Sequence, residues 1–372
     1  MGCLYKLALR PFLFRMDPER AHDSSKKFLR AAQDSRFMRG FFSQVFSYPW
    51  DQPVSVGGVV FPNPVGLAAG YDKNGELLGI IPSFGFGFVE VGTFTPHPQS
   101  GNPLPRIFRI PEKQAVLNRL GFNNCGAQEA VQHLKKFPVT PIPIGINIGK
   151  GVETPLEQAA EDYLTCFKTL FPYADYFVLN ISSPNTAELK KLHEPSRLRN
   201  LLATVTLENE RRKTNAKLLF IKISPDLSDQ ELSDVVGIAV SYKVGIVCCN
   251  TTSKGFRVQG SGVEFFDQPP APFAALRVPA GTPEESSVLA SSLQPLEFGG
   301  LSGKPLKETS TQMIRRVKEI SAGKIPIIGV GGIFTAADAK EKLEAGADLV
   351  QVYTGLIYEG PGLVKSILRG LA

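Results

Sequence analysis

Cysteine and histidine are both scarce in this 372-residue sequence, which has five cysteines and four histidines. The cysteines are odd in number and include no CxxC pair, a pattern that argues against a disulfide framework and favours a reducing compartment. The histidines show no HExxH-type spacing, and we interpret each as a surface residue or as a core residue with its hydrogen bonds satisfied. The sequence therefore predicts no metal site. These residues are Cys3, Cys125, Cys166, Cys248, Cys249, His22, His97, His133 and His193.

Long apolar runs are also missing. No stretch approaches the roughly 18 apolar residues that a helix needs to cross a bilayer, which argues against an integral membrane protein. The apolar stretch 4–14 is interrupted by Lys6, Arg10 and Pro11, and no cleavage-like site follows it. We therefore do not interpret it as a secretory signal.

The net charge is small, formally +6, but it is concentrated at one end of the chain. Residues 1–40 hold nine lysines and arginines against four aspartates and glutamates, an excess of five. One interpretation is a solvated helix face, and the other is attraction to an anionic membrane surface. The rest of the chain is close to neutral and has no basic stripe interleaved with aromatic residues, so we expect no nucleic-acid partner.

Residues 1–48 are predicted to form short helices ahead of the main domain, 49–372. Asp17 before Pro18 is typical of a helix N-cap followed by the first helical turn. The segment is rich in leucine and phenylalanine, and short helices cannot bury that much apolar surface by themselves. Its apolar side chains must therefore pack on the main domain or face lipid.

The main domain begins with a predicted hairpin around Gly57-Gly58, and a repeating pattern follows it. Short β-branched runs are each followed by a loop and a helical pattern, which is typical of βα units and a parallel sheet. Eight such units favour a closed (β/α)8 TIM barrel. The alternative is a doubly wound sheet, but no GxGxxG follows the first strand. The expected strands lie near 65–68, 87–91, 143–147, 176–180, 218–222, 244–249, 325–330 and 347–353.

The spacing of these units is expected to break once, after strand six. About 50 residues there, 252–301, show no clear period and carry several phenylalanines beside the run Pro269-Pro270-Ala271-Pro272. A loop of this length is usually functional or disordered. We predict a long insertion whose central part, 261–292, is a mobile lid or surface flap.

Polar residues are expected where the barrel strands end, and in this fold the loops there build the active site. Four asparagines and two lysines fall at these ends, with few carboxylates and no histidine. Such a set suits a planar, anionic, amide-rich ligand better than hydrolysis or metal-assisted chemistry. Glycine-rich turns at 299–303, 331–332 and 353–355 favour phosphate binding through backbone N–H groups.

Five motifs at these strand ends resemble those of dihydroorotate dehydrogenases, and the resemblance runs from about Pro49 to the C-terminus. Ser183 stands where the soluble branch of that family carries cysteine. Together with the N-terminal helices, it makes the chain similar to the membrane-associated, quinone-using class 2 branch. The motifs are Ala68-Ala69-Gly70-Tyr71-Asp72-Lys73, Asn118-Arg119-Leu120-Gly121-Phe122-Asn123, Asn180-Ile181-Ser182-Ser183-Pro184-Asn185, Gly300-Leu301-Ser302-Gly303-Lys304-Pro305 and Ile328-Gly329-Val330-Gly331-Gly332.

The resemblance implies an FMN-dependent oxidoreductase. It would oxidise (S)-dihydroorotate to orotate in de novo pyrimidine biosynthesis toward UMP, with a membrane quinone as final electron acceptor. Ser183 would be the catalytic residue that takes the C5 proton while the C6 hydride passes to the flavin. Because serine is a poor base, this role needs a relay and a closed, dry pocket. The alternative for Ser183 is a hydroxyl that stabilises the turn before Pro184.

The resemblance also implies two ligand sets, and Lys222 would stabilise the negative charge that the flavin gains on reduction. FMN would contact Ala69, Gly70, Thr93, Asn147, Asn180, Lys222, Cys249, Gly303, Gly332, Tyr353 and Thr354. Dihydroorotate would be held by Lys73, Asn118, Arg119, Leu120, Gly121, Phe122, Asn180, Asn185, Asn250 and Thr251. Cys249 departs from the threonine or serine that is usual in the family, so one flavin hydrogen bond would be weaker.

Location and partners follow from the same resemblance. Residues 1–48 would form the membrane and quinone-access segment of a peripheral protein, and we expect a monomer. Since no mitochondrial-type presequence precedes the helices, a bacterial inner membrane, on its cytoplasmic side, is favoured.

Two other functions stay open. Lys222 alone permits a Schiff-base aldolase or a sugar-phosphate isomerase on the same barrel, although neither uses Ser183 or the asparagines. The other alternative, a flavin-binding or membrane-adaptor protein without turnover, would leave every expected catalytic position filled but unused.

Overall fold

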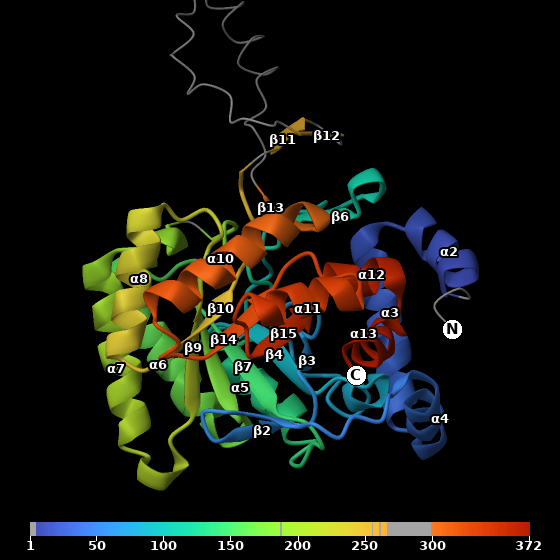
Figure 1. Ribbon diagram of the computed structural model, residues 1–372, viewed down its shortest axis with the longest axis horizontal. Coiled ribbons are helices and arrows are strands. Elements are labelled where there is room, and N and C mark those ends of the chain that lie inside the picture. The colour runs from blue at the N-terminus through green and yellow to red at the C-terminus, as the bar shows by residue number, and fades with distance from the viewer. Residues whose placement is uncertain (1–4, 187, 255, 260–261, 266–298) are drawn as a thin grey trace, which may run out of the picture.

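The computed structural model describes residues 5–186, 188–254, 256–259, 262–265 and 299–372. Its main domain is a closed barrel of eight parallel strands in the order β10-β14-β15-β3-β4-β7-β8-β9 (Figure 1). The predicted (β/α)8 class is confirmed, and every barrel strand overlaps its expected range. The strands are β3 (Val65–Leu67), β4 (Phe88–Phe94), β7 (Ile144–Ile148), β8 (Tyr176–Asn180), β9 (Leu218–Lys222), β10 (Gly245–Cys248), β14 (Ile327–Val330) and β15 (Leu349–Val352).

Helices surround this barrel, and short polar motifs fix where several of them begin. Ser228 and Glu231 form a reciprocal capping box at the start of α8, and Thr335 and Asp338 form one at the start of α11. The helices of the main domain are α5 (Ala127–Leu134), α6 (Ala159–Leu170), α7 (Pro195–Glu210), α8 (Asp229–Ser241), α10 (Lys307–Ile320), α11 (Ala336–Glu344), α12 (Thr354–Glu359) and α13 (Leu363–Leu371). Shorter 3-10 turns are η2 (Ile81–Phe84), η3 (Pro111–Lys113), η4 (Leu156–Gln158), η5 (Phe171–Tyr173), η6 (Leu189–His193), η7 (Lys213–Asn215) and η8 (Lys304–Leu306).

Aromatic side chains fill the lower half of the barrel interior. Phe88, Tyr176 and Phe220 belong to one buried cluster, which the hairpin β1 (Val54–Val56) and β2 (Val59–Phe61) closes from below. Glycines on neighbouring strands leave room for these rings: a Cβ on Gly145 would lie 2.1 Å from the Tyr176 ring. The interior is therefore packed solid under the barrel mouth, as this fold requires.

The N-terminal segment is helical, as predicted, and it lies beside α12 and α13 (Figure 1). Tyr5 Oη donates to Ile357 O at 2.6 Å, and Phe42 stacks on Phe84 with ring centroids 5.3 Å apart. Other apolar side chains stay outside, with Leu7 80% and Phe37 79% exposed. Among the described residues, no helix has both the length and the hydropathy to cross a membrane. The elements are η1 (Tyr5–Leu9, a π-helix), α2 (Arg10–Arg15), α3 (Pro18–Gln33) and α4 (Arg36–Phe46).

The expectation of a single break in the βα spacing is wrong, because a second break lies between β4 and β7. There the chain forms β5 (Ile107–Ile110) and β6 (Ala115–Asn118), which join β13 (Gly300–Gly303) in an antiparallel sheet above the barrel. The paired strands β6 and β13 are far apart in sequence, so no local sequence pattern predicts their pairing. In the predicted insertion, β11 (Phe256–Gln259) pairs with β12 (Gly262–Phe265). The predicted lid, 261–292, falls outside the described residues apart from β12.

Candidate active site at the barrel mouth

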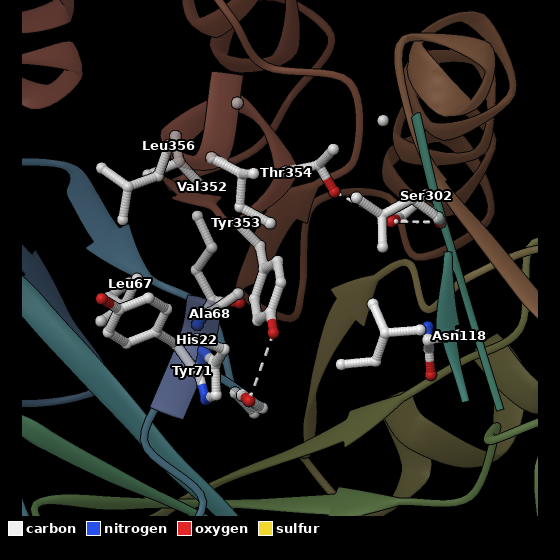
Figure 2. Close-up of a pocket in the computed structure, with 18 of the residues that line it drawn as sticks. His22, Leu67, Ala68, Tyr71, Asn118, Ser302, Val352, Tyr353, Thr354 and Leu356 are labelled. Atoms are coloured by element: carbon white, nitrogen blue, oxygen red, sulfur yellow. Dashed lines mark hydrogen bonds between the residues drawn. The ribbon is translucent and has the colours of Figure 1, made fainter. Parts of the chain in front are cut away.

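A cavity of about 520 Å³ opens at the carboxyl ends of the barrel strands and continues between the barrel and the N-terminal helices. In Figure 2, Tyr353 lies between Tyr71 and His22 on one side and Asn118 and Ser302 on the other. One end of this cavity is polar and the other is apolar. The cavity thus joins the strand ends of the barrel to the N-terminal helices.

Most of the residues predicted from the sequence meet in this cavity, and two do not line it. Those that line it are Ala69, Gly70, Lys73, Thr93, Asn118, Leu120, Gly121, Phe122, Asn180, Ser183, Asn185, Lys222, Cys249, Asn250, Thr251, Gly303, Gly332, Tyr353 and Thr354. Asn147 lies beneath the floor, and the Arg119 guanidinium turns back to donate to Pro105 O at 2.8 Å.

Four of the asparagines that line the polar end hold one another in place as two hydrogen-bonded pairs. Asn185 Nδ2 donates to Asn118 Oδ1 at 3.0 Å, and Asn250 Nδ2 donates to Asn180 Oδ1 at 3.3 Å. Since each amide still has capacity for further hydrogen bonds, the set can present both donors and acceptors to a planar ligand.

Ser183 lies on the loop after β8, with only 5% of its surface exposed. Its Oγ accepts a hydrogen bond from Asn185 N at 3.3 Å, the geometry of a serine turn. The turn uses an oxygen lone pair and leaves the hydroxyl proton free to be donated. The turn and a role in proton transfer are therefore compatible, and the backbone donor would stabilise negative charge that develops on Oγ.

The floor of the polar end is a buried hydrogen-bonded network. Asn147 Oδ1 accepts from Thr93 Oγ1 at 2.6 Å and from Asn180 Nδ2 at 3.3 Å, so Asn147 orients two residues that line the cavity. Its Nδ2 donates to Glu90 Oε1 at 2.7 Å, and Lys222 Nζ lies 3.6 Å from the same oxygen. Asn147 thus acts on the cavity through its neighbours.

Lys73 brings a second cationic group to the polar end. Burial and the nearby Lys26 ammonium lower the pKa of Lys73 to about 8. Glu19 and Asp23 oppose this shift, and Arg106 adds to it. Lys73 is therefore charged at neutral pH but close to losing its proton, and an anionic ligand would favour the charged form.

Two glycines form a tight cradle on the rim. Gly303 and Gly332 have φ of +102° and +71°, which favour glycine. A Cβ on Gly332 would lie 2.4 Å from Lys307 Cα, and one on Gly303 would lie 2.3 Å from Gln114 O. Backbone alone fits here, and bare backbone near a helix start is how barrels of this type bind phosphate.

The other end of the cavity is apolar, and the N-terminal segment supplies much of its wall. Residues on one face of α3 line it at helical spacing, including Pro18, His22, Ser25 and Leu29. Burial and Lys73 lower the pKa of His22 to about 3, so its ring is neutral. Arg109 reaches this end with its guanidinium 4.8 Å from the centroid of the Phe14 ring, and it donates to Met16 O at 2.9 Å.

No sequence motif assigned a functional role to His22, Arg109 or Glu90. His22 was interpreted as a surface or satisfied core histidine, whereas it lines the cavity beside Tyr71, with ring centroids 5.3 Å apart. The apolar face of the helix that carries it was the available signal. Within the part of the chain that the structure describes, no cluster of three or more His, Cys, Asp or Glu side chains suits a metal ion.

Comparison with known proteins gives consistent matches over nearly the whole chain. The family model described as dihydroorotate dehydrogenase matches residues 53–269 and 282–372. A protein of Synechococcus sp. named dihydroorotate dehydrogenase (quinone) is 47% identical, over 99% of this chain and 93% of the relative. A protein of the same name from Christiangramia forsetii is 43% identical, over 98% of this chain and 97% of the relative.

Solved structures agree with the sequence matches. The crystal structure of DHODH from Eimeria tenella in complex with ferulenol superposes with a TM-score of 0.75 at 35% identity. The match covers 95% of this chain and 90% of that one. A ligand-free structure from the same organism gives a TM-score of 0.70 at 34% identity.

Proposed function

The chain belongs to the dihydroorotate dehydrogenase family, and from this premise we propose that it oxidises (S)-dihydroorotate to orotate at the barrel mouth. FMN is the proposed hydride acceptor and a quinone the final electron acceptor. The step lies on the route to UMP in de novo pyrimidine synthesis. One observation carries the proposal: a single cavity joins Ser183 and the asparagines to an apolar end formed by the N-terminal helices.

The residues at the polar end fit FMN. Gly303 and Gly332 line the cavity with bare backbone whose N–H groups would suit a phosphate, and the amides and Lys222 suit the polar edge of a flavin ring. When bound, FMN supplies the hydride acceptor. We propose that Ala69, Gly70, Thr93, Asn180, Lys222, Cys249, Gly303, Gly332, Tyr353 and Thr354 contact it, and that Asn147 orients Thr93 and Asn180.

For the substrate, we propose that the Lys73 ammonium pairs with the carboxylate of dihydroorotate and that the asparagine amides bind its ring. The proposed set is Lys73, Asn118, Leu120, Gly121, Phe122, Asn180, Asn185, Asn250 and Thr251. Arg119 would act through the loop that it holds, since its guanidinium binds Pro105 O.

Ser183 is the proposed acceptor of the C5 proton, and its own hydroxyl proton would leave through the hydrogen-bonded relay that a serine base needs. Ser183 lines the cavity, and the backbone N–H of Asn185, which donates to its Oγ, would stabilise negative charge on that atom. Burial of the surrounding side chains keeps water away from the reacting carbons, which a weak base requires. The neighbouring Ser182 Oγ accepts a hydrogen bond from Asn250 Nδ2 at 2.9 Å. Ser182 would thereby hold the loop that carries Asn250 in place.

We propose that the apolar end admits the quinone and that residues 1–48 bind the membrane surface. Exposed apolar side chains of this segment support the proposal, as does its excess of five positive charges. Residues 1–48 and 49–372 are then the access segment and the catalytic domain of a monomeric, peripheral membrane protein. Attachment to the cytoplasmic side of a bacterial inner membrane is part of the same proposal.

The geometry gives less support to an aldolase or isomerase built on Lys222. A Schiff base needs an amine that is free to attack a carbonyl, whereas Lys222 Nζ lies 3.6 Å from the fully buried Glu90 carboxylate and is held in that ion pair. Such an enzyme would also leave Ser183 and the asparagines without a role.

An anaerobic titration tests the proposal directly. The purified protein should show flavin absorbance, dihydroorotate should bleach it, and a quinone should restore it. A colourless protein that cannot bind FMN would refute the proposal. A yellow protein that dihydroorotate does not bleach would support the binding or adaptor function instead.

A further inference from the structure

Glu90 is a carboxylate buried in the centre of the barrel, and its position follows from strand alternation. On β4, Phe88 points into the aromatic layer of the barrel interior, so Glu90, two residues later, points inward one layer higher. On β9, Lys222 follows Phe220 in the same way, and on β15, Gln351 follows Leu349. Three strands thus deliver polar side chains to one level, directly below the cavity.

At this level Glu90 accepts hydrogen bonds on both oxygens. Oε2 accepts from Gln351 Nε2 at 2.6 Å, and Oε1 accepts from Asn147 Nδ2 at 2.7 Å. All three side chains have no exposed surface. Since a buried carboxylate without partners would be strongly unfavourable, these two donors offset the cost of its burial and hold it in a fixed place.

Lys222 stands between this carboxylate and the cavity. Its Nζ lies 3.6 Å from Glu90 Oε1, and among the described residues Glu90 is its one ion-pair partner. Lys222 and Gln351 line the cavity, whereas Glu90 does not. A ligand at the barrel mouth would therefore contact a lysine whose positive charge is partly balanced by Glu90, on the side away from the ligand.

We propose that Glu90 is a positioning residue that sets, through Lys222, how strongly the site favours the reduced form of its cofactor. This inference rests on the proposed function, because it takes FMN to lie against Lys222. A lone ammonium would stabilise the negative charge gained on reduction, and the carboxylate behind it weakens that effect. The pair keeps the reduced cofactor able to pass its electrons on to a quinone.

The test is the equilibrium constant for two-electron reduction of the bound flavin in Glu90→Gln, measured by anaerobic titration against a reference dye. Glutamine keeps the shape and removes the charge, so the constant should rise about tenfold, which corresponds to about 30 mV. Reoxidation by a short-chain quinone should slow, while reduction by dihydroorotate should not. An unchanged equilibrium constant would overturn the proposal.

Two further variants separate charge from structure. Glu90→Asp keeps the charge, so its equilibrium constant should stay within about threefold of that of the parent protein. Glu208→Gln removes an ion-paired carboxylate on α7, outside the barrel, and should change nothing in the titration. If Glu90→Asp shifts the constant as far as Glu90→Gln does, the effect is one of packing and the proposal fails.

Glu90→Gln places an amide donor next to two existing donors, so it can fail to fold. The exchange Glu90→Gln with Gln351→Glu restores a complementary pair and moves the carboxylate off the Lys222 contact. Since Gln351 lines the cavity, the carboxylate of this variant still lies beside the ligand, so its equilibrium constant should fall well below that of Glu90→Gln, and a value equal to that of Glu90→Gln would overturn the proposal. A parent protein without flavin would refute the proposed function itself, whereas a flavin-loaded parent with unshifted variants refutes the Glu90 inference alone.

Discussion

The Lys190 ammonium lies 2.9 Å from the Asp226 carboxylate, and this ion pair ties the loop after β8 to the loop after β9. The same carboxylate accepts from Thr252 Oγ1 at 2.5 Å and from Ser253 N at 2.9 Å. One side chain thus holds two loops, one carrying Ser183 and the other following Asn250. Although burial acts to raise it, hydrogen bonds from Thr252, Lys190 and Ser253 keep the pKa of Asp226 below its usual value.

Asp226→Asn should therefore destabilise the protein by about 1–3 kcal/mol at neutral pH. Because the folded-state pKa of Asp226 is lowered, its contribution is fully present above the unfolded-state value of about 4 and is lost as the pH falls through the folded value. Urea unfolding of parent and variant between pH 3 and 7 should show the difference in unfolding free energy shrink toward the acid end. Glu188→Gln removes an exposed carboxylate paired with Lys191 and should leave the free energy of unfolding nearly unchanged. An equal loss at all pH values would contradict the argument.

Ser183→Ala should slow flavin reduction by dihydroorotate by about 10²- to 10⁴-fold while FMN stays bound, because no other side chain is proposed to take the C5 proton. Stopped-flow absorbance gives the rate and the spectrum gives the flavin content. Ser224 is a matched control, since its Oγ also accepts from a backbone N–H two residues on, Asp226 N at 3.2 Å, yet it does not line the cavity. If Ser224→Ala slows the reaction as much, Ser183 matters only as a turn residue.

Orotate binding should weaken as the pH rises above about 8, the pKa of Lys73 in the free protein. Above that value the protein loses the cation proposed to meet the carboxylate, so the Kd should rise by roughly tenfold per pH unit. Flavin absorbance between pH 6.5 and 9.5 follows the binding. In Lys73→Met the dependence should disappear.

Two other lysines serve as controls for this pH dependence. In Lys26→Met the midpoint of the pH dependence of orotate binding should move to higher pH, because the Lys26 charge helps to lower the pKa of Lys73. Lys150 is buried outside the cavity and bonded to Thr154 O at 2.6 Å, so Lys150→Met should leave the pH profile unaltered. A profile that stays the same in Lys73→Met would remove Lys73 from the substrate site.

Phe37→Glu should weaken binding to anionic lipid vesicles by at least about tenfold, since the Phe37 side chain is 79% exposed on the N-terminal segment. Vesicle co-sedimentation at several salt concentrations measures this, and parent binding should fall as salt rises. Val139 is 88% exposed on the main domain, and Val139→Glu is the matched control. If both variants bind equally well, the segment is not the membrane contact.

The barrel could be predicted because its signal is local. Each strand is a short β-branched run such as Leu218–Lys222, and a closed parallel barrel places every strand end on one face. The positions of Asn180 and Lys222 at strand ends were therefore enough to predict that they meet. The motif resemblance then supplied Ser183 and the ligand sets.

The sequence could not predict how deep a side chain lies below the barrel mouth, or which residues far apart in the chain contact one another. Asn147 and Lys222 both lie at strand ends, yet one is under the floor and the other on the cavity surface, and strand alternation does not fix that difference. The role of Glu90 follows from Gln351, 261 residues later. Likewise, His22 belongs to the cavity only because α3 packs over the barrel mouth.

The cavity is built by two parts of the chain that meet different chemical demands, and this bears on selective inhibition. Its polar end must complement reactants of fixed structure, so few substitutions there would preserve turnover. Its outer end, with residues such as Leu9, Leu13 and Phe28, requires only an apolar shape and can accept other apolar side chains at little cost. Compounds seated in the outer end should discriminate between species and lose potency to resistance substitutions, whereas analogues of dihydroorotate should act on many enzymes and be harder to escape.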